Sequence, residues 1–215
     1  YMGAPVELVE APNGAITNKL LLDGIDKVAS TKPTIEEPTE DVWFLSGFGL
    51  APMAVIDTPE GLIAIDTGDT KHDGELMFEG LRTVTDKPVK AIIYGHSHTC
   101  YGAGVFAEGN EDIQIIGHPD LNAVVEKNAG GAPASFPEIG PYLTARLLIQ
   151  FKTFMPSEGP DAWVVPTNLE VDEGAFIPVN TPVEDEQEME VLGVKMQFFT
   201  RYGSDDKVHT TVWLP

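Results

Sequence analysis

Short apolar runs separated by turn residues are the clearest pattern in the sequence. The run Val89–Ile93 (VKAII) is almost continuously apolar, which is typical of a strand that is buried on both faces. Residues 54–57 and 62–66 form two more such runs, joined by the residues TPEG at 58–61. Pro and Gly stand there in positions that a tight turn favours. The pattern therefore predicts a β-hairpin followed by a buried strand.

The other patterned segments predict a mixed chain of the α/β or α+β class. The remaining segments with strand character are residues 41–45, 112–116, 191–200 and 207–213. A helix is expected at residues 78–85, just before the buried strand, and another after Asp120, which can cap it. Strands and helices thus alternate through the middle of the chain.

The first forty residues are weakly patterned and are interrupted by four prolines. Residues 16–29 can hold one helix, and residues 32–41 (KPTIEEPTED) read as a polar connector. We expect residues 1–40 to form an arm and residues 41–215 to form one domain. A long Pro-rich and acidic surface excursion is expected within that domain near residues 156–190. The short strands expected in this excursion are residues 162–165 and 175–179.

The buried strand leads into two histidines that are separated by one residue. Side chains two positions apart in an extended backbone point the same way, so the imidazoles of His96 and His98 leave the strand end together. Two neutral imidazoles that converge on one point supply half of a zinc or iron site. The simpler alternative is that one ring caps a turn while the other faces solvent. The spacing, followed by Gly102 and Gly104, favours a metal.

A hydrophobic strand that runs into His-x-His and a glycine-rich turn resembles the His-x-His-x-Asp-His-x-Gly-Gly motif of the metallo-β-lactamase superfamily. Residues 43–70 and 115–131 further resemble its alkylsulfatase branch, whose enzymes hydrolyse sulfate esters of long-chain alcohols. The resemblance implies that this chain is the N-terminal part of an αββα sandwich. It also implies that His96 and His98 bind zinc and that Asp66 braces the metal loop by hydrogen bonding.

The chain departs from that motif immediately after His98. Cys100 and Tyr101 stand where the superfamily has the Asp and His that hold a second metal. A thiolate at Cys100 is a soft ligand that suits zinc, whereas the Tyr101 phenol is a poor replacement for an imidazole. The resemblance therefore implies one zinc site, with His96, His98 and Cys100 as its candidate ligands, and leaves the second metal position unsupported.

The other candidate residues have simpler interpretations. His118 follows a predicted strand and is expected to cap the next helix or face solvent rather than bind a metal. His209 is expected on a strand face, and His72 is expected to be exposed. Arg146 could meet an anion, but a position on a helix surface is the simpler expectation.

The net charge of the chain limits the classes of molecule that it is expected to bind. The net charge of −21 argues against nucleic acid and against anionic membrane surfaces, both of which would repel the chain. No apolar window is long enough to span a bilayer. The acidity fits a salt-adapted protein, an exported protein or a chain that docks on a less acidic partner, with a periplasmic or secreted location favoured. An anionic substrate would need a local cation, which a bound metal supplies.

The resemblance implies a metal-dependent hydrolase that acts on alkyl sulfates or related small-molecule esters. The second half of the sandwich, with the remaining ligands, is not recognisable in the 215 residues. We therefore expect a second polypeptide to complete the fold in an oligomeric assembly. The alternative is a non-catalytic subunit of the same fold, retained for assembly or binding. Loss of the Asp-His pair favours this alternative, and the intact His96-Ser97-His98 opposes it.

Overall fold

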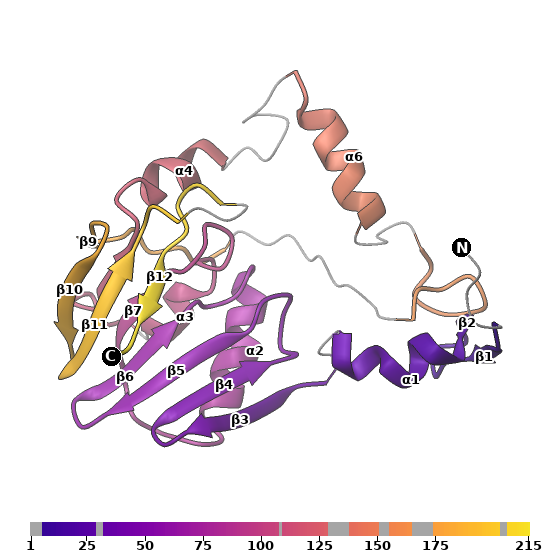
Figure 1. Cartoon of the computed structure of the whole chain (residues 1–215), viewed down its shortest axis with the longest axis horizontal. Helices are drawn as coiled ribbons and strands as arrows, with labels where there is room; N and C mark the ends of the chain where they lie inside the picture. Colours follow the sequence, from indigo (N-terminus) through magenta and orange to yellow (C-terminus); the bar gives the residue numbers. More distant parts are fainter. Residues whose placement is uncertain are drawn as a thin grey trace. The chain divides into compact units, whose positions relative to one another are not determined.

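The computed structural model divides into two compact units (Figure 1). It describes residues 6–28, 32–107, 109–128, 138–150, 155–164, 174–202 and 206–215. The first unit comprises the described residues of Tyr1–Lys32 and Gly130–Glu170, and the second those of Pro33–Ala129 and Val171–Pro215. The expected boundary near residue 40 stays a prediction.

The second unit is built on a seven-stranded sheet whose strands follow one another in sequence order. Its strands are β3 (Thr34–Thr39), β4 (Val42–Ser46), β5 (Met53–Thr58), β6 (Gly61–Ile65), β7 (Val89–Ile93), β8 (Gln114–Gly117) and β9 (Thr181–Pro182). The pairs from β3 to β6 are antiparallel, and those from β6 to β9 are parallel. The helices of this unit are α2 (Lys71–Leu81), α3 (Ala103–Ala107) and α4 (Leu121–Asn128).

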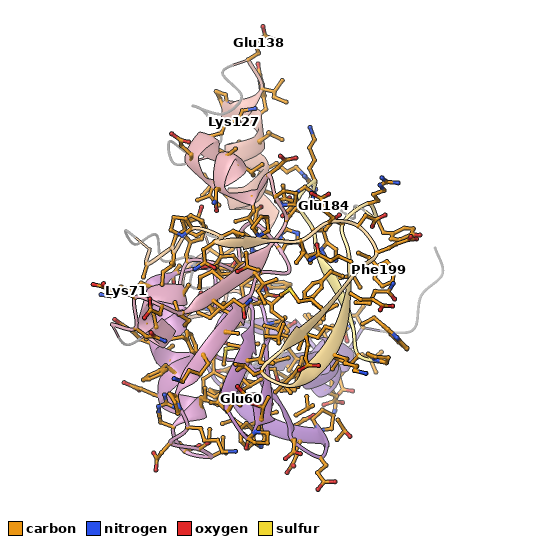
Figure 2. The ribbon with its side chains drawn as sticks, turned by 90° about the vertical axis from the view of Figure 1, so that its left-hand side faces the viewer. Glu60, Lys71, Lys127, Glu138, Glu184 and Phe199 are labelled. Carbon is orange, nitrogen blue, oxygen red and sulfur yellow. The ribbon has the colours of Figure 1, made fainter. Side chains whose placement is uncertain are left out.

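A second sheet of three antiparallel strands covers one face of the first sheet. Its strands are β10 (Gln187–Val191), β11 (Val194–Phe199) and β12 (Thr211–Trp213). Met196 and Phe198 of β11 pack in one core cluster with Ile93 of β7. The preceding residue of β7, Ile92, points to the other face and belongs to the cluster that contains Met77 of α2. The central strands are therefore covered by helices on one face and by a sheet on the other, with Lys71 and Phe199 on opposite sides in Figure 2.

The strongest patterns in the sequence predicted their elements correctly. β7 occupies the predicted residues, and all of its side chains except Lys90 are buried. The predicted hairpin is formed by β5 and β6, with Thr58 paired to Gly61. The Thr58 hydroxyl donates to the Gly61 carbonyl at 2.8 Å, which stabilises the turn.

Two elements of the second unit differ from their predictions. The expected polar connector contains β3, whose side chains are largely exposed because it is an edge strand held by backbone pairing to β4. The helix expected at residues 78–85 begins at Lys71 and ends at Leu81. It begins there because the Thr70 hydroxyl accepts the Asp73 N–H at 2.9 Å.

The short strands expected within the acidic excursion also differ from their predictions, whereas the excursion itself stays a prediction. Residues 174–179 form no regular strand, although the Ala175 N–H donates to the Tyr101 carbonyl at 2.5 Å. The other short strand expected there, residues 162–165, is irregular at 162–164, and residue 165 lies outside the described residues.

The first unit contains a short hairpin and two helices. Its elements are β1 (Leu8–Glu10), β2 (Ile16–Asn18), α1 (Lys19–Val28) and α6 (Gly140–Gln150). The predicted helix at 16–29 thus begins later, after β2. A small cluster of Ala11, Ala15 and Ala162 is buried, with Leu22 and Val164 packed against it. In the part of the chain that the structure describes, no helix is long and apolar enough to cross a membrane.

Candidate functional site

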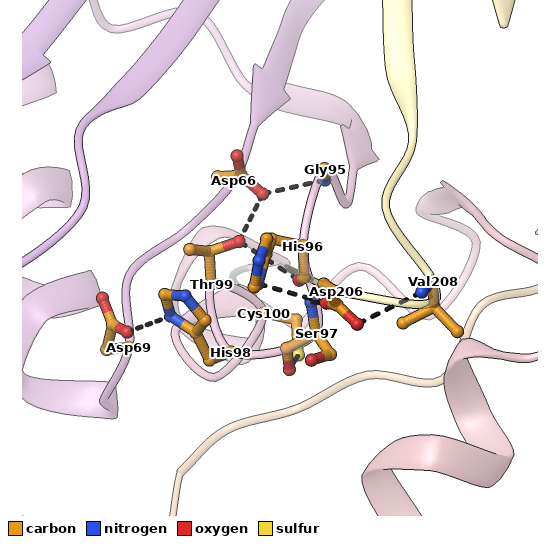
Figure 3. A network of polar contacts seen from close by, with 10 residues as sticks. All are labelled: Asp66, Asp69, Gly95, His96, Ser97, His98, Thr99, Cys100, Asp206 and Val208. Atoms are coloured by element: carbon orange, nitrogen blue, oxygen red, sulfur yellow. Dashed lines mark hydrogen bonds and ion pairs between the residues drawn. The ribbon is translucent and has the colours of Figure 1, made fainter. Parts of the chain in front are cut away.

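The predicted histidines lie at one edge of the seven-stranded sheet. β6 and β7 are parallel, so the residues that follow them, Asp66 and Gly95, emerge at the same edge. The segment that precedes β12 reaches this edge from the second sheet, where the Thr210 N–H donates to the Gly95 carbonyl at 2.9 Å. Three segments that are distant in sequence therefore meet here (Figure 3).

Asp66 connects the two strand ends. Its Oδ1 accepts the Gly95 N–H at 2.9 Å and the Thr99 hydroxyl at 2.5 Å. Its backbone adopts φ 62°, a left-handed conformation that costs a non-glycine residue free energy and persists where the surroundings fix it. Burial raises the pKa of the Asp66 carboxyl, and the hydrogen bonds from Thr99 and Gly95 oppose that shift. Its contribution to a metal site stays a prediction.

The two imidazoles lie side by side, and each has a carboxylate at its Nδ1. The ring centroids of His96 and His98 are 4.2 Å apart. His98 Nδ1 contacts Asp69 Oδ1, and His96 Nδ1 lies 3.1 Å from Asp206 Oδ2. The hydrogen bond with Asp69 raises the pKa of His98. The His98 side chain is 50% exposed, whereas that of His96 is 19% exposed.

The sequence analysis missed the two carboxylates and a third imidazole. Asp69 follows β6, and Asp206 precedes β12. Burial on its own would raise the pKa of Asp206, but hydrogen bonds from Ser97 and Val208 outweigh it, so the pKa lies below its ordinary value.

The strand-face prediction for His209 is wrong. β12 begins only at Thr211, and the His209 ring lies 6.1 Å from the His96 ring, centroid to centroid. The available signal for placing His209 at the site was its position two residues before β12. The sequence pattern did not show which strand end that histidine would face.

Three buried polar atoms at this edge have no hydrogen-bond partner among the described residues, Asp69 Oδ2, His209 Nδ1 and Thr210 Oγ1. Buried polar atoms usually have partners, and an ordered water or an ion would supply them here. Imidazole and carboxylate donors suit zinc. Within residues 6–28, 32–107 and the other described ranges, however, no set of three or more His, Cys, Asp or Glu side chains is arranged to hold an ion. The residues present therefore fit part of a metal site.

Cys100 and Tyr101 point into the core of the second unit. The Cys100 side chain is fully buried, and its thiol donates to the Ser97 carbonyl at 3.1 Å. Burial raises the pKa of the Cys100 thiol to about 12. Tyr101 packs on Phe176, with ring centroids 6.4 Å apart. The role of Cys100 as a ligand stays a prediction, and its contacts favour a neutral thiol that packs in the core.

The remaining candidates lie away from this edge or have local roles. His118 Nδ1 accepts the Asp120 N–H at 3.1 Å, which agrees with a capping role before α4. His72 is exposed on α2 and lies 3.8 Å from Glu75. Arg146 is exposed on α6, in the first unit.

Comparisons with known proteins agree with the resemblance that the motif predicted. No protein-family model matches the chain. Over 146 residues, 67% of the chain, it is 30% identical to a linear primary-alkylsulfatase from Pseudomonas sp. (strain ATCC 19151), and the match covers 28% of that protein.

Solved structures give the same result for the fold. The stereoselective inverting sec-alkylsulfatase Pisa1 from Pseudomonas sp. matches 85% of this chain with a TM-score of 0.67 and 17% identity. A subclass B3 metallo-β-lactamase of Bradyrhizobium japonicum matches 88% of it with a TM-score of 0.56 and 15% identity. The matched regions cover 30% and 60% of those two chains. The chain therefore spans less than a third of the length of the alkylsulfatases that it matches.

Proposed function

We propose that this chain, which has the fold of part of a metallo-β-lactamase domain and is similar in sequence to alkylsulfatases, belongs to a metal-dependent hydrolase of alkyl sulfates or related esters. The observation that carries the proposal is the pair of imidazoles 4.2 Å apart, each with a carboxylate at its Nδ1. Carboxylate partners of this kind orient histidines that bind metals. The 30% identity to a linear primary-alkylsulfatase supports the class of substrate.

The proposed ligands are His96 and His98, with His209 as the third, although its ring would have to move closer to complete a set of three. The partnerless and buried Nδ1 of His209, together with the distance of 6.1 Å between its ring and that of His96, supports this choice. Cys100 remains the alternative third ligand, and it would need its thiol to leave the Ser97 carbonyl. Asp66 would hold the loop of the two histidines through Gly95 and Thr99.

A zinc ion at this edge would supply a nucleophilic hydroxide near neutral pH and a positive charge that offsets the charge forming on the ester. The chain itself would supply the scaffold that orients its ligands. Its net charge of −21 would otherwise repel a sulfate ester, so a local cation is also needed for binding. We propose one zinc ion, because Cys100 and Tyr101 are both engaged in the core.

We further propose that additional polypeptide completes the second sheet, as a second chain or as a continuation of this one, in an oligomeric assembly. β12 has only three residues and pairs with β11 along one edge. Trp213 on this strand is 59% exposed, and Leu214 is 41% exposed. An edge strand with large exposed apolar side chains is a site where another strand can add. Native mass spectrometry of the purified protein tests this, and a soluble, monomeric chain of 215 residues that retains activity would contradict it.

Metal analysis tests the enzymatic proposal directly. Purified protein should contain about one zinc ion per chain, as a three-ligand catalytic site implies. The double variant His96→Ala/His98→Ala should lose the ion and the hydrolysis of dodecyl sulfate, whereas His72→Ala, exposed on α2, should retain both. Metal-free wild-type protein would contradict the proposal.

The second candidate function is a non-catalytic subunit of the same fold. It is favoured by the lack of a set of three ligand side chains in the described part of the chain. In that case the purified assembly would contain no stoichiometric metal, and the double variant His96→Ala/His98→Ala would assemble normally.

A further inference from the structure

The Asp206 side chain joins the second sheet to the histidine loop. It is 8% exposed and comes from the segment before β12 (Figure 3). Its Oδ2 accepts the Ser97 N–H at 2.6 Å and lies 3.1 Å from His96 Nδ1. Its Oδ1 accepts the Val208 N–H at 3.1 Å. One carboxylate thus contacts the loop after β7 and also shapes the segment that carries His209.

The contact with His96 favours one tautomer of that ring. A carboxylate oxygen 3.1 Å from Nδ1 is attracted by a proton on this nitrogen and repelled by a lone pair. The favoured neutral ring therefore carries its proton on Nδ1 and presents an unprotonated Nε2. Nε2 is then the atom that is able to bind a metal.

The contact with Val208 positions the third imidazole. An aspartate that accepts the N–H two residues later forms a tight local turn, which fixes the backbone between residues 206 and 208. Two residues further on, Thr210 donates to the Gly95 carbonyl at 2.9 Å. His209 lies between these two anchors, so its distance from His96 depends on both of them.

We infer that Asp206 is a positioning residue, which fixes the Nδ1–H tautomer of His96 and holds His209 beside it. The importance of this role for a metal rests on the proposed function. The role itself is a property of the metal-free chain. Asp69 differs from Asp206, because it contacts the exposed His98 from the loop after β6 and lies outside the segment that carries His209.

The full chain with ¹⁵N-labelled histidine and without metal tests the inference. Long-range ¹H–¹⁵N correlation spectra should show His96 mainly as the Nδ1–H tautomer. In Asp206→Ala, which removes the oxygen beside His96 Nδ1 and the acceptor of the Val208 N–H, that tautomer should lose its dominance, and hydrogen exchange at the Thr210 amide should become faster. The affinity for zinc should fall by about 10- to 100-fold, as expected for loss of a partner behind a metal-binding histidine.

Asp185→Ala is the matched control. The Asp185 side chain is 15% exposed, accepts backbone N–H groups from Thr200 and Arg201, and comes from the segment that leads into β10. It should leave the His96 tautomer, the Thr210 amide and zinc affinity unchanged.

An unchanged His96 tautomer in Asp206→Ala, with zinc affinity within twofold of the Asp185→Ala control, would overturn the inference. Failure of the proposed function has a different result, because wild-type protein would then bind no zinc. In that case a tautomer shift and faster exchange in Asp206→Ala still support the positioning role, and their absence overturns it.

Discussion

Tyr101 packs its ring against Phe176, with centroids 6.4 Å apart, and a Cβ on Gly174 would lie only 2.8 Å from the Tyr101 ring. The Tyr101 backbone is also held by hydrogen bonds. Its N–H donates to the Gly68 carbonyl, and its carbonyl accepts the Ala175 N–H. The position that follows the buried Cys100 is therefore part of the core on the helical side of the sheet. Restoring the Asp-His pair of the superfamily motif would require this core to rearrange.

Cys100→Asp should destabilise the protein strongly. The Cys100 side chain is 0% exposed and belongs to the large core cluster, so a carboxylate there would be buried among apolar side chains. We expect a loss of about 3 kcal/mol or more in the free energy of unfolding, compared with about 1 kcal/mol for Cys100→Ala. Urea unfolding with matched m-values measures both. Equal losses for the two variants would contradict the core position of Cys100.

Thr99→Val should cost more stability than the same change at Thr58. Both side chains are buried, and both hydroxyls donate a hydrogen bond, Thr99 to the Asp66 carboxyl and Thr58 to the Gly61 carbonyl. Hydrogen bonds to a charged group contribute about 1.5–3 kcal/mol, compared with about 1 kcal/mol for bonds between neutral groups. Paired urea titrations give the two losses, and a larger loss at Thr58 would show that Asp66 is not held by Thr99.

Gly102→Ala should disrupt the turn after the histidine loop. A Cβ on Gly102 would lie 2.0 Å from the Thr67 carbonyl oxygen and 2.7 Å from the Gly74 Cα, which are both backbone atoms. Overpacking against backbone costs about 1–3 kcal/mol or more. Gly24→Ala in α1, where a Cβ meets nothing within 4 Å, should instead stabilise the protein by about 0.5–1 kcal/mol. Thermal unfolding of both variants measures the opposite shifts in Tm.

Asp73→Asn should show a pH-dependent gain in stability. Burial raises the pKa of Asp73, with its hydrogen bond to Thr70 opposing the shift and Asp69 adding to it. A raised carboxyl pKa contributes stability below the unfolded pKa, and this contribution is lost as the pH rises through the folded pKa. The variant should therefore have a higher Tm than wild type at pH 7, and the difference should shrink toward pH 3. A difference in Tm that grows toward pH 3 would contradict the upward direction of the Asp73 pKa shift.

The elements that the sequence predicted correctly are those in which apolar residues occupy the buried positions. Val89–Ile93 is apolar because both of its faces are covered, and the β5–β6 turn contains the Pro and Gly that it needs. β3 was missed because an exposed edge strand is specified by backbone pairing, which leaves no apolar pattern. α2 was placed too late because its start depends on the hydroxyl of Thr70 rather than on an apolar stripe.

Only the part of the site that is local in sequence could be predicted, for a similar reason. His96 and His98 are neighbours in sequence, and the geometry of a strand end brings their side chains together. Asp206 and His209 reach them only through the packing of the second sheet, and no local pattern carries that information. Cys100 was interpreted from its chemistry alone, whereas in the structure it is buried in the core, and this burial raises the pKa of its thiol.

The hydrogen bond between Ser97 and Asp206 spans 109 positions in the chain. Closing so long a loop costs entropy that only the packing of the intervening strands can offset. We therefore expect the histidine loop to reach its final shape after β10 and β11 have docked. A ribosome-bound chain that has not yet released residues 206–215 would present two imidazoles with only one of their carboxylate partners. Capture of a metal would then follow the closing of the second sheet rather than guide it.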